Sequence, residues 1–244
     1  MIQRRYSKPF HYDPDHPCYC GKGAVFGDCC GSQNKDREPP QGIDIVHDFL
    51  SKSDCRRLTR YADKQKANWL MVRDEEKSTA TRFVEKRDDG RVTQQVEMDK
   101  HQSFLNETIR RALQEVATRK YGAFDYFETP YLLRYKVGGK YGVHADSEIY
   151  DSEKSLFYRV SDRDLSLLIY LNDDFDGGEL AFDRLSYRYH PTAGDVVMFP
   201  SSSLYLHQAE SITRGKKYAL VSWASLITTH KLFPGASRWP PIKV

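Results

Sequence analysis

Residues 131–146 read YLLRYKVGGKYGVHAD, and this stretch carries the strongest information about the fold. Its first part, residues 131–137, alternates side chains between two faces, which is the period of a β-strand. His144 and Asp146 lie two positions apart, so on an extended backbone both side chains face the same way. His207 is a second imidazole, which the intervening predicted strands can return to the same place. Two imidazoles and one carboxylate can bind three adjacent positions of an octahedral metal and leave the other three open, as in non-haem Fe(II) sites.

Lys217, ten residues beyond His207, indicates what fills two of the open metal positions. On the predicted strand 217–223 its ammonium shares a face with apolar side chains, whereas Lys216 has the opposite parity. An ammonium among apolar neighbours is costly unless an anion meets it. We therefore expect a dicarboxylate, 2-oxoglutarate, between the metal and Lys217, with Trp223 as a wall of the pocket.

The composition is that of a globular protein with one sizeable domain and an appendage. The chain has 244 residues and a formal net charge of +3, which is too small to indicate a nucleic-acid partner. No apolar run approaches the roughly 18–20 residues of a membrane-spanning helix. Residues 1–17 lack the apolar stretch of a signal peptide. We expect a cytoplasmic protein with neither a membrane nor a nucleic-acid partner.

Two helices are predicted before most of the strands. Residues 51–54 form a capping-box start, after which Cys55, Leu58 and Ala62 fall on one helical face. A second apolar stripe runs through residues 105–116. Both helices are expected to pack on the outside of a sheet, so Cys55 is interpreted as a buried core thiol.

Beyond residue 126 the pattern changes to short strands separated by Gly, Asp and Pro turns, which predicts a β-sandwich or barrel with helical support. The predicted strands are 131–137, 165–171, 179–182, 186–190, 195–199 and 217–223, and residues 43–50 are apolar enough for another. The charged stretch 73–99 is expected to form loops or a hairpin, with Asp89-Gly90 as a turn. The polar, tyrosine-rich stretch 147–161 follows the metal ligands and is expected to be a lid.

Four of the five cysteines, Cys18, Cys20, Cys29 and Cys30, gather near the N-terminus. A reducing compartment keeps thiols free of disulfides, so the cluster predicts a tetrahedral zinc site. Two disulfides are disfavoured because adjacent cysteines rarely satisfy disulfide geometry together. His16 is the alternative to Cys30 as the fourth ligand.

The cysteine spacing, with Gly21, Gly23 and Gly31 in place, resembles the SEC-C motif, a small zinc knuckle that serves as an interaction module. The chain departs from the motif at Lys22 and at residues 24–25. Zinc ligation is compatible with that departure, whereas a basic partner-binding surface is less well supported.

The chain is therefore expected to divide into four parts. Residues 1–36 hold the SEC-C-like zinc knuckle and its tail, and the polar, proline-containing residues 37–42 are a linker. Residues 43–230 form the main domain, and residues 231–244 form a C-terminal tail.

The main domain resembles the prolyl 4-hydroxylase group of the 2-oxoglutarate/Fe(II) dioxygenases. The matching stretches are 133–146, 163–172, 177–182, 193–199, His207 and 215–223. The resemblance extends over about residues 43–228 and fixes the order of these stretches as well as their content. It implies an α+β, mainly β fold: a double-stranded β-helix, or jelly roll, with supporting helices and the iron at its open end.

The same resemblance assigns the metal and its co-substrate. It makes His144, Asp146 and His207 the iron ligands and gives Lys217 the basic position that pairs with the distal carboxylate of 2-oxoglutarate. The implied cofactors are Fe(II), 2-oxoglutarate and O2, with ascorbate as an optional reductant and zinc as a separate structural metal.

Three further residues match family positions around the site. Tyr170 matches a tyrosine that donates to the distal carboxylate, and Tyr135 matches one that lines the cofactor pocket. Arg163 matches a position near the substrate mouth. The alternative interpretations are core or rim tyrosines and a solvated arginine at a strand edge.

The resemblance implies a hydroxylase that consumes 2-oxoglutarate and O2, releases succinate and CO2, and acts on prolyl residues of a protein or peptide docked by the zinc knuckle. A hydroxylase of a free amino acid or other small metabolite is the alternative, and it predicts a closed pocket with a charge for the substrate carboxylate. Removal of alkyl groups from nucleic-acid bases is disfavoured because that group places arginines after the second histidine. A non-catalytic scaffold is disfavoured by the intact metal-binding triad and lysine.

Overall fold

The computed structural model describes residues 14–18, 23–29, 38–73, 77, 84–232 and 242–244. Its helices are α1 (Lys52–Asp63), α2 (Gln102–Ala112) and α3 (Thr118–Tyr121), and a π-helical turn (Leu113–Ala117) joins the last two. Short 3₁₀ turns occupy Asp99–His101, Asp183–Leu185 and Ser203–Tyr205. Within the described ranges, no helix is long and apolar enough to span a membrane.

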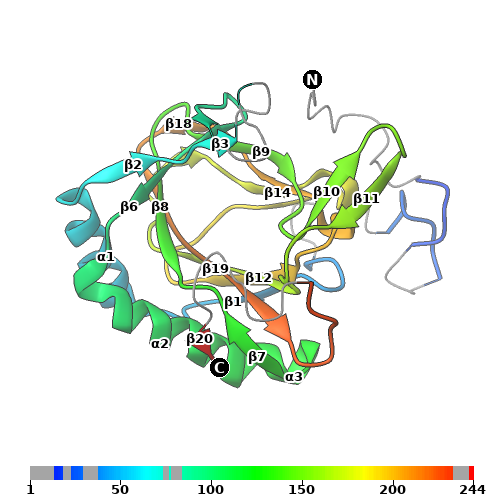
Figure 1. The fold of residues 1–244 in the computed structure, drawn as a ribbon, viewed down its shortest axis with the longest axis horizontal. Coiled ribbons are helices and arrows are strands. Elements are labelled where there is room, and N and C mark those ends of the chain that lie inside the picture. Colours follow the sequence, from blue (N-terminus) through cyan, green and yellow to red (C-terminus); the bar gives the residue numbers. More distant parts are fainter. Residues whose placement is uncertain (1–13, 19–22, 30–37, 74–76, 78–83, 233–241) are drawn as a thin grey trace.

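Two antiparallel sheets build the body of the fold (Figure 1). The major sheet runs in the order β1 (Asp44–Val46), β16 (Val196–Pro200), β12 (Leu165–Tyr170), β19 (Lys217–Leu226), β8 (Tyr131–Tyr135), β6 (Gln94–Val96), β2 (Ala67–Trp69). At its side, β7 (Phe124–Phe127) pairs with β19 and with β20 (Ile242–Lys243). The minor sheet runs in the order β15 (Tyr187–Tyr189), β14 (Leu180–Phe182), β17 (His207–Ala209), β9 (Lys140–His144), β5 (Arg91–Val92).

Three two-stranded pairs complete the set: β3 (Val72–Arg73) with β4 (Glu85–Lys86), β10 (Glu148–Asp151) with β11 (Leu156–Arg159), and β13 (Asp176–Gly177) with β18 (Ile212–Arg214). The mainly β prediction with supporting helices is confirmed, and the antiparallel sheets are consistent with the expected jelly roll.

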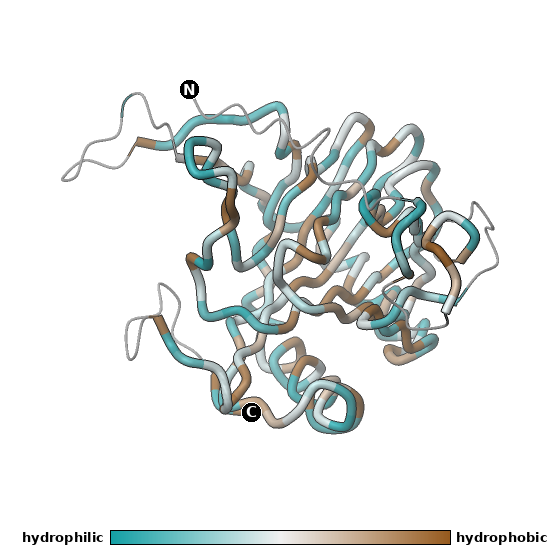
Figure 2. Tube along the Cα trace, turned by 90° about the vertical axis from the view of Figure 1, so that its right-hand side faces the viewer, coloured by the Kyte–Doolittle hydropathy of each residue, from teal (hydrophilic) through white to brown (hydrophobic). Residues whose placement is uncertain are grey.

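The helices cover the outer face of the major sheet, as predicted. Side chains of α1 and α2 form one buried cluster with outward-facing residues of the central strands, among them Leu167 and Ile169 of β12 and Leu220 of β19. Cys55 belongs to this cluster and is buried, which confirms its interpretation as a core thiol. Figure 2 shows the same segregation, with hydrophobic residues gathered inside and hydrophilic ones on the helix surfaces.

The start of α1 follows the predicted cap. The Ser51 hydroxyl accepts a hydrogen bond of 3.1 Å from the backbone N–H of Asp54, which satisfies a donor that the first helical turn leaves open. The preceding strand is shorter than the predicted 43–50, because β1 ends at Val46. Asp48 adopts a left-handed conformation with φ 52°, and its N–H binds the Asp195 carboxylate, which turns the chain toward the helix.

The second core lies between the sheets. Inward-facing side chains of the major sheet, including Tyr170, Phe199 and Ala219, meet Leu180 and Phe182 of the minor sheet. The alternation along β12 divides its residues between this core and the helical layer. Both faces of β12 and β19 are therefore buried, which explains their nearly continuous apolar sequence.

The described part of residues 73–99 contains the expected hairpin pairing, because β3 pairs antiparallel with β4. The Asp88 carboxylate accepts a 2.6 Å hydrogen bond from Gly90 N–H, so the chain turns where the sequence predicts. The segment then supplies β5 to the minor sheet and β6 to the major sheet. The described part of this stretch thus contributes strands to both layers.

The stretch 147–161 forms the β10–β11 hairpin, which projects to one side of the sandwich (Figure 1). Ser147 O accepts a 2.8 Å hydrogen bond from Val160 N–H at its base. Ile149 and Tyr158 are cross-strand partners with exposed side chains. The predicted lid is thus a hairpin with an apolar exposed pair, rooted directly after Asp146.

The N-terminal zinc prediction falls partly outside the described residues, because Cys20 and Cys30 are not among them. In the described part, Cys18 N–H donates to Ala24 O at 2.9 Å, and residue 26 pairs back to residue 16 at 2.8 Å. Two short backbone segments, residues 16–18 and 24–26, therefore run antiparallel to each other. At the opposite terminus, the expected tail 231–244 includes β20, which joins the major sheet.

Candidate active site

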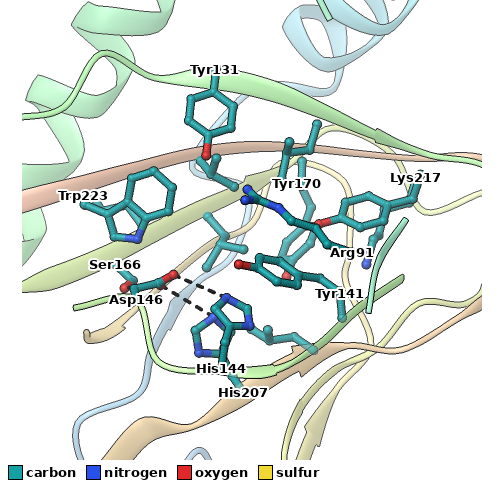
Figure 3. A pocket seen from close by; sticks show the side chains of 18 residues that line it. Arg91, Tyr131, Tyr141, His144, Asp146, Ser166, Tyr170, His207, Lys217 and Trp223 are labelled. Atoms are coloured by element: carbon teal, nitrogen blue, oxygen red, sulfur yellow. Dashed lines mark hydrogen bonds and ion pairs between the residues drawn. The ribbon is translucent and has the colours of Figure 1, made fainter. Parts of the chain in front are cut away.

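His144, Asp146 and His207 meet at the open end between the two sheets (Figure 3). Their ligand atoms all lie within 4.8 Å of one another. The two histidines are direct cross-strand partners on β9 and β17, so the sheet register itself sets the spacing of their rings. The Nε2 atoms lie 3.4 Å (His144) and 3.6 Å (His207) from the Asp146 carboxylate oxygens.

Backbone carbonyls orient both imidazoles. His144 Nδ1 lies 2.9 Å from Gly142 O, and His207 Nδ1 lies 3.1 Å from Tyr205 O. A carbonyl can only accept, so each Nδ1 carries a proton and each Nε2 is directed toward the site. Such hydrogen bonds fix the tautomer that a metal ligand requires.

Asp146 is held as a carboxylate by its surroundings. Burial would raise its pKa, but His207, His144 and a hydrogen bond from Ser166 together hold the pKa below its usual range. The Ser166 hydroxyl donates to Asp146 Oδ2 at 2.6 Å and lies 2.8 Å from the Ser201 hydroxyl. For His207, burial and then the neighbouring His144 lower the pKa to about 4, so its ring is neutral at physiological pH. Two imidazole nitrogens and one carboxylate oxygen are the donor set that Fe(II) prefers.

Lys217 is the second feature of the site. It begins β19, is only 1% exposed and donates a 2.6 Å hydrogen bond to Gly178 O. Its ammonium lies over the Tyr135 ring, 4.6 Å from the centroid. Burial lowers its pKa to about 7, and in the described part of the chain no carboxylate lies within ion-pair distance. A buried cation without an anion, in the same pocket as the triad, fits the distal carboxylate of 2-oxoglutarate.

Comparison with known proteins agrees with this geometry. Residues 130–225 match the family described as the 2OG-Fe(II) oxygenase superfamily. Over these residues the chain is similar to that superfamily. The matched stretch contains all three residues of the triad and Lys217, so Fe(II) and 2-oxoglutarate fit the residues present.

Two curated relatives and one solved structure illustrate the similarity. A PKHD-type hydroxylase of Hyphomonas neptunium is 43% identical over 101 residues, which are 39% of this chain and 42% of that protein. Prolyl 3-hydroxylase 2 of Mus musculus is 32% identical over 93 residues, 34% of this chain and 13% of that protein. The match thus spans less than half of either relative. The viral collagen prolyl hydroxylase of Paramecium Bursaria Chlorella virus-1, in its 2OG complex, shares the fold at a TM-score of 0.53 and 19% identity, covering 77% and 97% of the two chains.

The oxygenase pocket encloses about 540 Å³, including its open mouth. Tyr135 and Tyr170 line it, and both are almost completely buried. Burial raises the pKa of both phenols, so each remains a neutral hydrogen-bond donor. Their position beside Lys217 is the one the sequence predicts, whereas their contact with a co-substrate stays a prediction.

Arg163 is not a solvated strand-edge residue. Its guanidinium forms a two-point ion pair with Glu128, at 2.5 and 2.7 Å, and lies 3.8 Å over the Trp223 ring. A third nitrogen reaches Asp146 O at 3.3 Å. Arg163 therefore supports the wall residue Trp223 and the backbone of Asp146, and it does not itself line the described pocket.

Three pocket residues were missed by the sequence interpretation. Ser166 binds Asp146, Tyr141 stacks on His144 with ring centroids 3.7 Å apart, and Arg91 lies over the Tyr141 ring at 4.6 Å. The inward parity of Ser166 in an otherwise apolar strand is a signal that could have identified it. No comparable signal marks Arg91, because it lies in the charged stretch 73–99.

Proposed function

We propose that this protein is a 2-oxoglutarate- and O2-dependent hydroxylase of prolyl residues in a protein or peptide, which releases succinate and CO2. The observation that carries the proposal is that the His-Asp-His triad shares one pocket with a buried Lys217, which forms no ion pair with any described carboxylate. The prolyl assignment is supported by the similarity to the mouse prolyl 3-hydroxylase and to the viral collagen prolyl hydroxylase fold.

In this proposal the chain contributes binding and orientation. His144 and His207 offer their Nε2 atoms and Asp146 one oxygen, and Ser166 holds the other carboxylate oxygen in place. When bound, Fe(II) supplies the O2 activation that couples decarboxylation of 2-oxoglutarate to hydroxylation.

Around the metal site, Lys217 fixes the distal carboxylate of 2-oxoglutarate, and Tyr135 and Tyr170 shield that ion pair from water. Trp223 and Tyr131 form the opposite wall, with ring centroids 5.8 Å apart. The pocket thereby presents a dry, aromatic surface to the carbon that is hydroxylated.

A hydroxylase of a free amino acid is the second candidate. It is favoured by a specific observation, the second cation Arg91 in the wall of the pocket. The two candidates differ in whether a proline must be part of a peptide.

The test is an anaerobic titration of Fe(II) and 2-oxoglutarate, followed by oxygen-dependent succinate release with proline-containing peptides and with free amino acids, each with and without ascorbate. The proposal expects hydroxyproline and succinate in equal amounts from peptides. Asp146→Ala should abolish metal binding and turnover, and unchanged succinate formation in this variant would overturn the iron assignment.

We further propose that residues 1–36 form a zinc-binding unit that docks the substrate, with Cys18, Cys20, Cys29 and Cys30 as ligands. Its support is the cysteine spacing and the antiparallel backbone contacts around Cys18. Metal analysis of the full chain should give one zinc that Cys29→Ala removes. Cys55→Ala, which alters only a core thiol, is the control and should retain it.

A further inference from the structure

Arg91 lies in the wall of the oxygenase pocket. Within the part of the chain that the structure describes, no acidic residue forms an ion pair with it. It begins β5 at the edge of the minor sheet, where its register partner is Tyr141 of β9. Its guanidinium stacks on Tyr141, which in turn stacks on His144. Figure 3 shows this order and places the guanidinium near the Tyr131 hydroxyl, with its end directed into the pocket. The cation is thus one aromatic ring away from an iron ligand.

The hydrogen-bonding capacity of Arg91 is incompletely used. Its Nε is buried and has no hydrogen-bond partner, and no ion pair joins Arg91 to an acidic residue within the described ranges. The polar groups around it are the phenols of Tyr131, Tyr135 and Tyr141. A guanidinium remains charged at physiological pH. A buried N–H without an acceptor costs free energy, and a guanidinium binds a planar carboxylate with two parallel hydrogen bonds.

A second cation is unnecessary for the distal carboxylate of 2-oxoglutarate, because Lys217 already occupies that end of the pocket. Lys217 lies on the major sheet, enclosed by the rings of Tyr135, Tyr170 and Phe175. Arg91 comes from the minor sheet and ends between Tyr131 and Tyr141. The two cations therefore serve different parts of the pocket.

We infer that Arg91 binds a carboxylate of the hydroxylated substrate. This inference rests on the proposed function and specifies it: the substrate carries an anionic group close to the carbon that reacts. The carboxylate comes from the C-terminus of a peptide that ends in proline, from free proline, or from an acidic side chain beside the proline. A neutral peptide with an internal proline lacks the group that Arg91 requires.

The experiment compares matched acids and amides on the full-length Fe(II) protein with 2-oxoglutarate, without oxygen for binding and with oxygen for succinate release. The pairs are acetyl-proline and its amide, a proline-ending peptide and its amide, free proline and prolinamide, and an internal proline beside Glu or Gln. Wild-type protein should bind at least one acid about 10- to 100-fold more tightly than its amide. The pair that shows this preference identifies the source.

Arg91→Gln should abolish the preference by raising the KM for the acid with little change in kcat. Arg91→Lys keeps the charge without the two-point geometry, and it should retain part of the preference. Arg184→Gln is the matched control, because Arg184 also has a buried Nε without a partner but does not line the pocket. It should behave as wild type.

Equal binding of acids and amides by wild-type protein would overturn the assignment, as would a preference that survives in Arg91→Gln. A weaker affinity for 2-oxoglutarate alone in Arg91→Gln would also overturn it, because Arg91 would then serve the co-substrate. Failure of the proposed function has a different signature, namely that no proline compound stimulates succinate release whatever its charge.

Discussion

Ser166 donates a hydrogen bond of 2.6 Å to Asp146 from the opposite sheet. Asp146 follows β9 of the minor sheet, whereas Ser166 lies on β12 of the major sheet with no exposed surface. The same hydroxyl lies 2.8 Å from Ser201, so it is held from two sides. The orientation of the only anionic ligand therefore depends on how the two sheets pack against each other.

Ser166→Ala should weaken metal binding roughly 10- to 100-fold, because the hydrogen bond that orients a ligating carboxylate is removed. The dissociation constant for Mn(II), measured without oxygen, reports this change. Ser222→Ala is the matched control, since Ser222 is equally buried but bonds to Glu128 O at 2.6 Å. Equal metal affinities of the two variants would contradict the orienting role.

Lys217→Met should raise the dissociation constant of 2-oxoglutarate by roughly 10- to 100-fold, since a charged hydrogen bond is lost, and should leave metal affinity unchanged. The ligand-free variant should also unfold at a higher temperature than wild type, because a desolvated cation is replaced by an apolar chain of similar size. Lys216→Met, at a half-exposed residue paired with Asp63, is the control and should alter neither property. A lower melting temperature for Lys217→Met would show that Lys217 stabilises the fold.

The ammonium of Lys217 should give the ligand-free protein a distinctive pH dependence. Its folded-state pKa is about 7, below the ordinary value of 10.5, so between these values the unfolded chain binds a proton that the folded protein lacks. The free energy of unfolding, relative to Lys217→Met, should therefore rise as pH increases from about 7 to 10.5 and stay at its lower level below pH 7. Urea denaturation of both proteins across this range measures the difference, and parallel curves would contradict the burial of the charge.

Binding of 2-oxoglutarate should reverse that shift. The incoming carboxylate favours the charged lysine, so binding at pH 8 should be accompanied by proton uptake. Calorimetry in buffers of different ionisation enthalpy measures the uptake. Lys217→Met should bind weakly and without it, and proton uptake that persists in this variant would place the titrating group elsewhere.

Glu128 and Arg163 should be strongly coupled. Glu128→Gln replaces the carboxylate that pairs with the Arg163 guanidinium by a neutral amide. We expect a loss of roughly 1–3 kcal/mol in the free energy of unfolding, because the pair is mostly but not fully buried. Arg163→Met should cost a similar amount, and the double variant should cost less than the sum. Additive losses in this double-mutant cycle would mean that the two-point ion pair contributes nothing.

The parts of the site that follow strand periodicity could be predicted from the sequence. Lys217 faces the pocket because β19 keeps its two-residue period, and His207 returns to His144 because their strands are hydrogen-bonded neighbours. The two helices were predictable from their own periodicity, because a regular apolar stripe matches one continuous helical face.

Other parts depend on irregularity or on distant pairing. Tyr141 and His144 are three residues apart and would point to opposite faces of a regular strand, but a register shift against β17 brings both rings to one side. Arg91 reaches the pocket only because β5 pairs with β9, although α2, α3 and three strands lie between them in the sequence. A charged residue in a charged stretch carries no local mark of such a pairing, so its role emerges only from the folded chain.

The site draws on both layers of the sandwich, with His144 and His207 on the minor sheet and Lys217 with its tyrosines on the major sheet. A bound metal and its co-substrate therefore contact residues of both sheets. The two sheets can separate only after these ligands are released. A ligand present at 100 times its dissociation constant adds about 2.7 kcal/mol to the free energy of opening. The resistance of the protein to proteolysis should therefore increase with the concentrations of iron and 2-oxoglutarate around it.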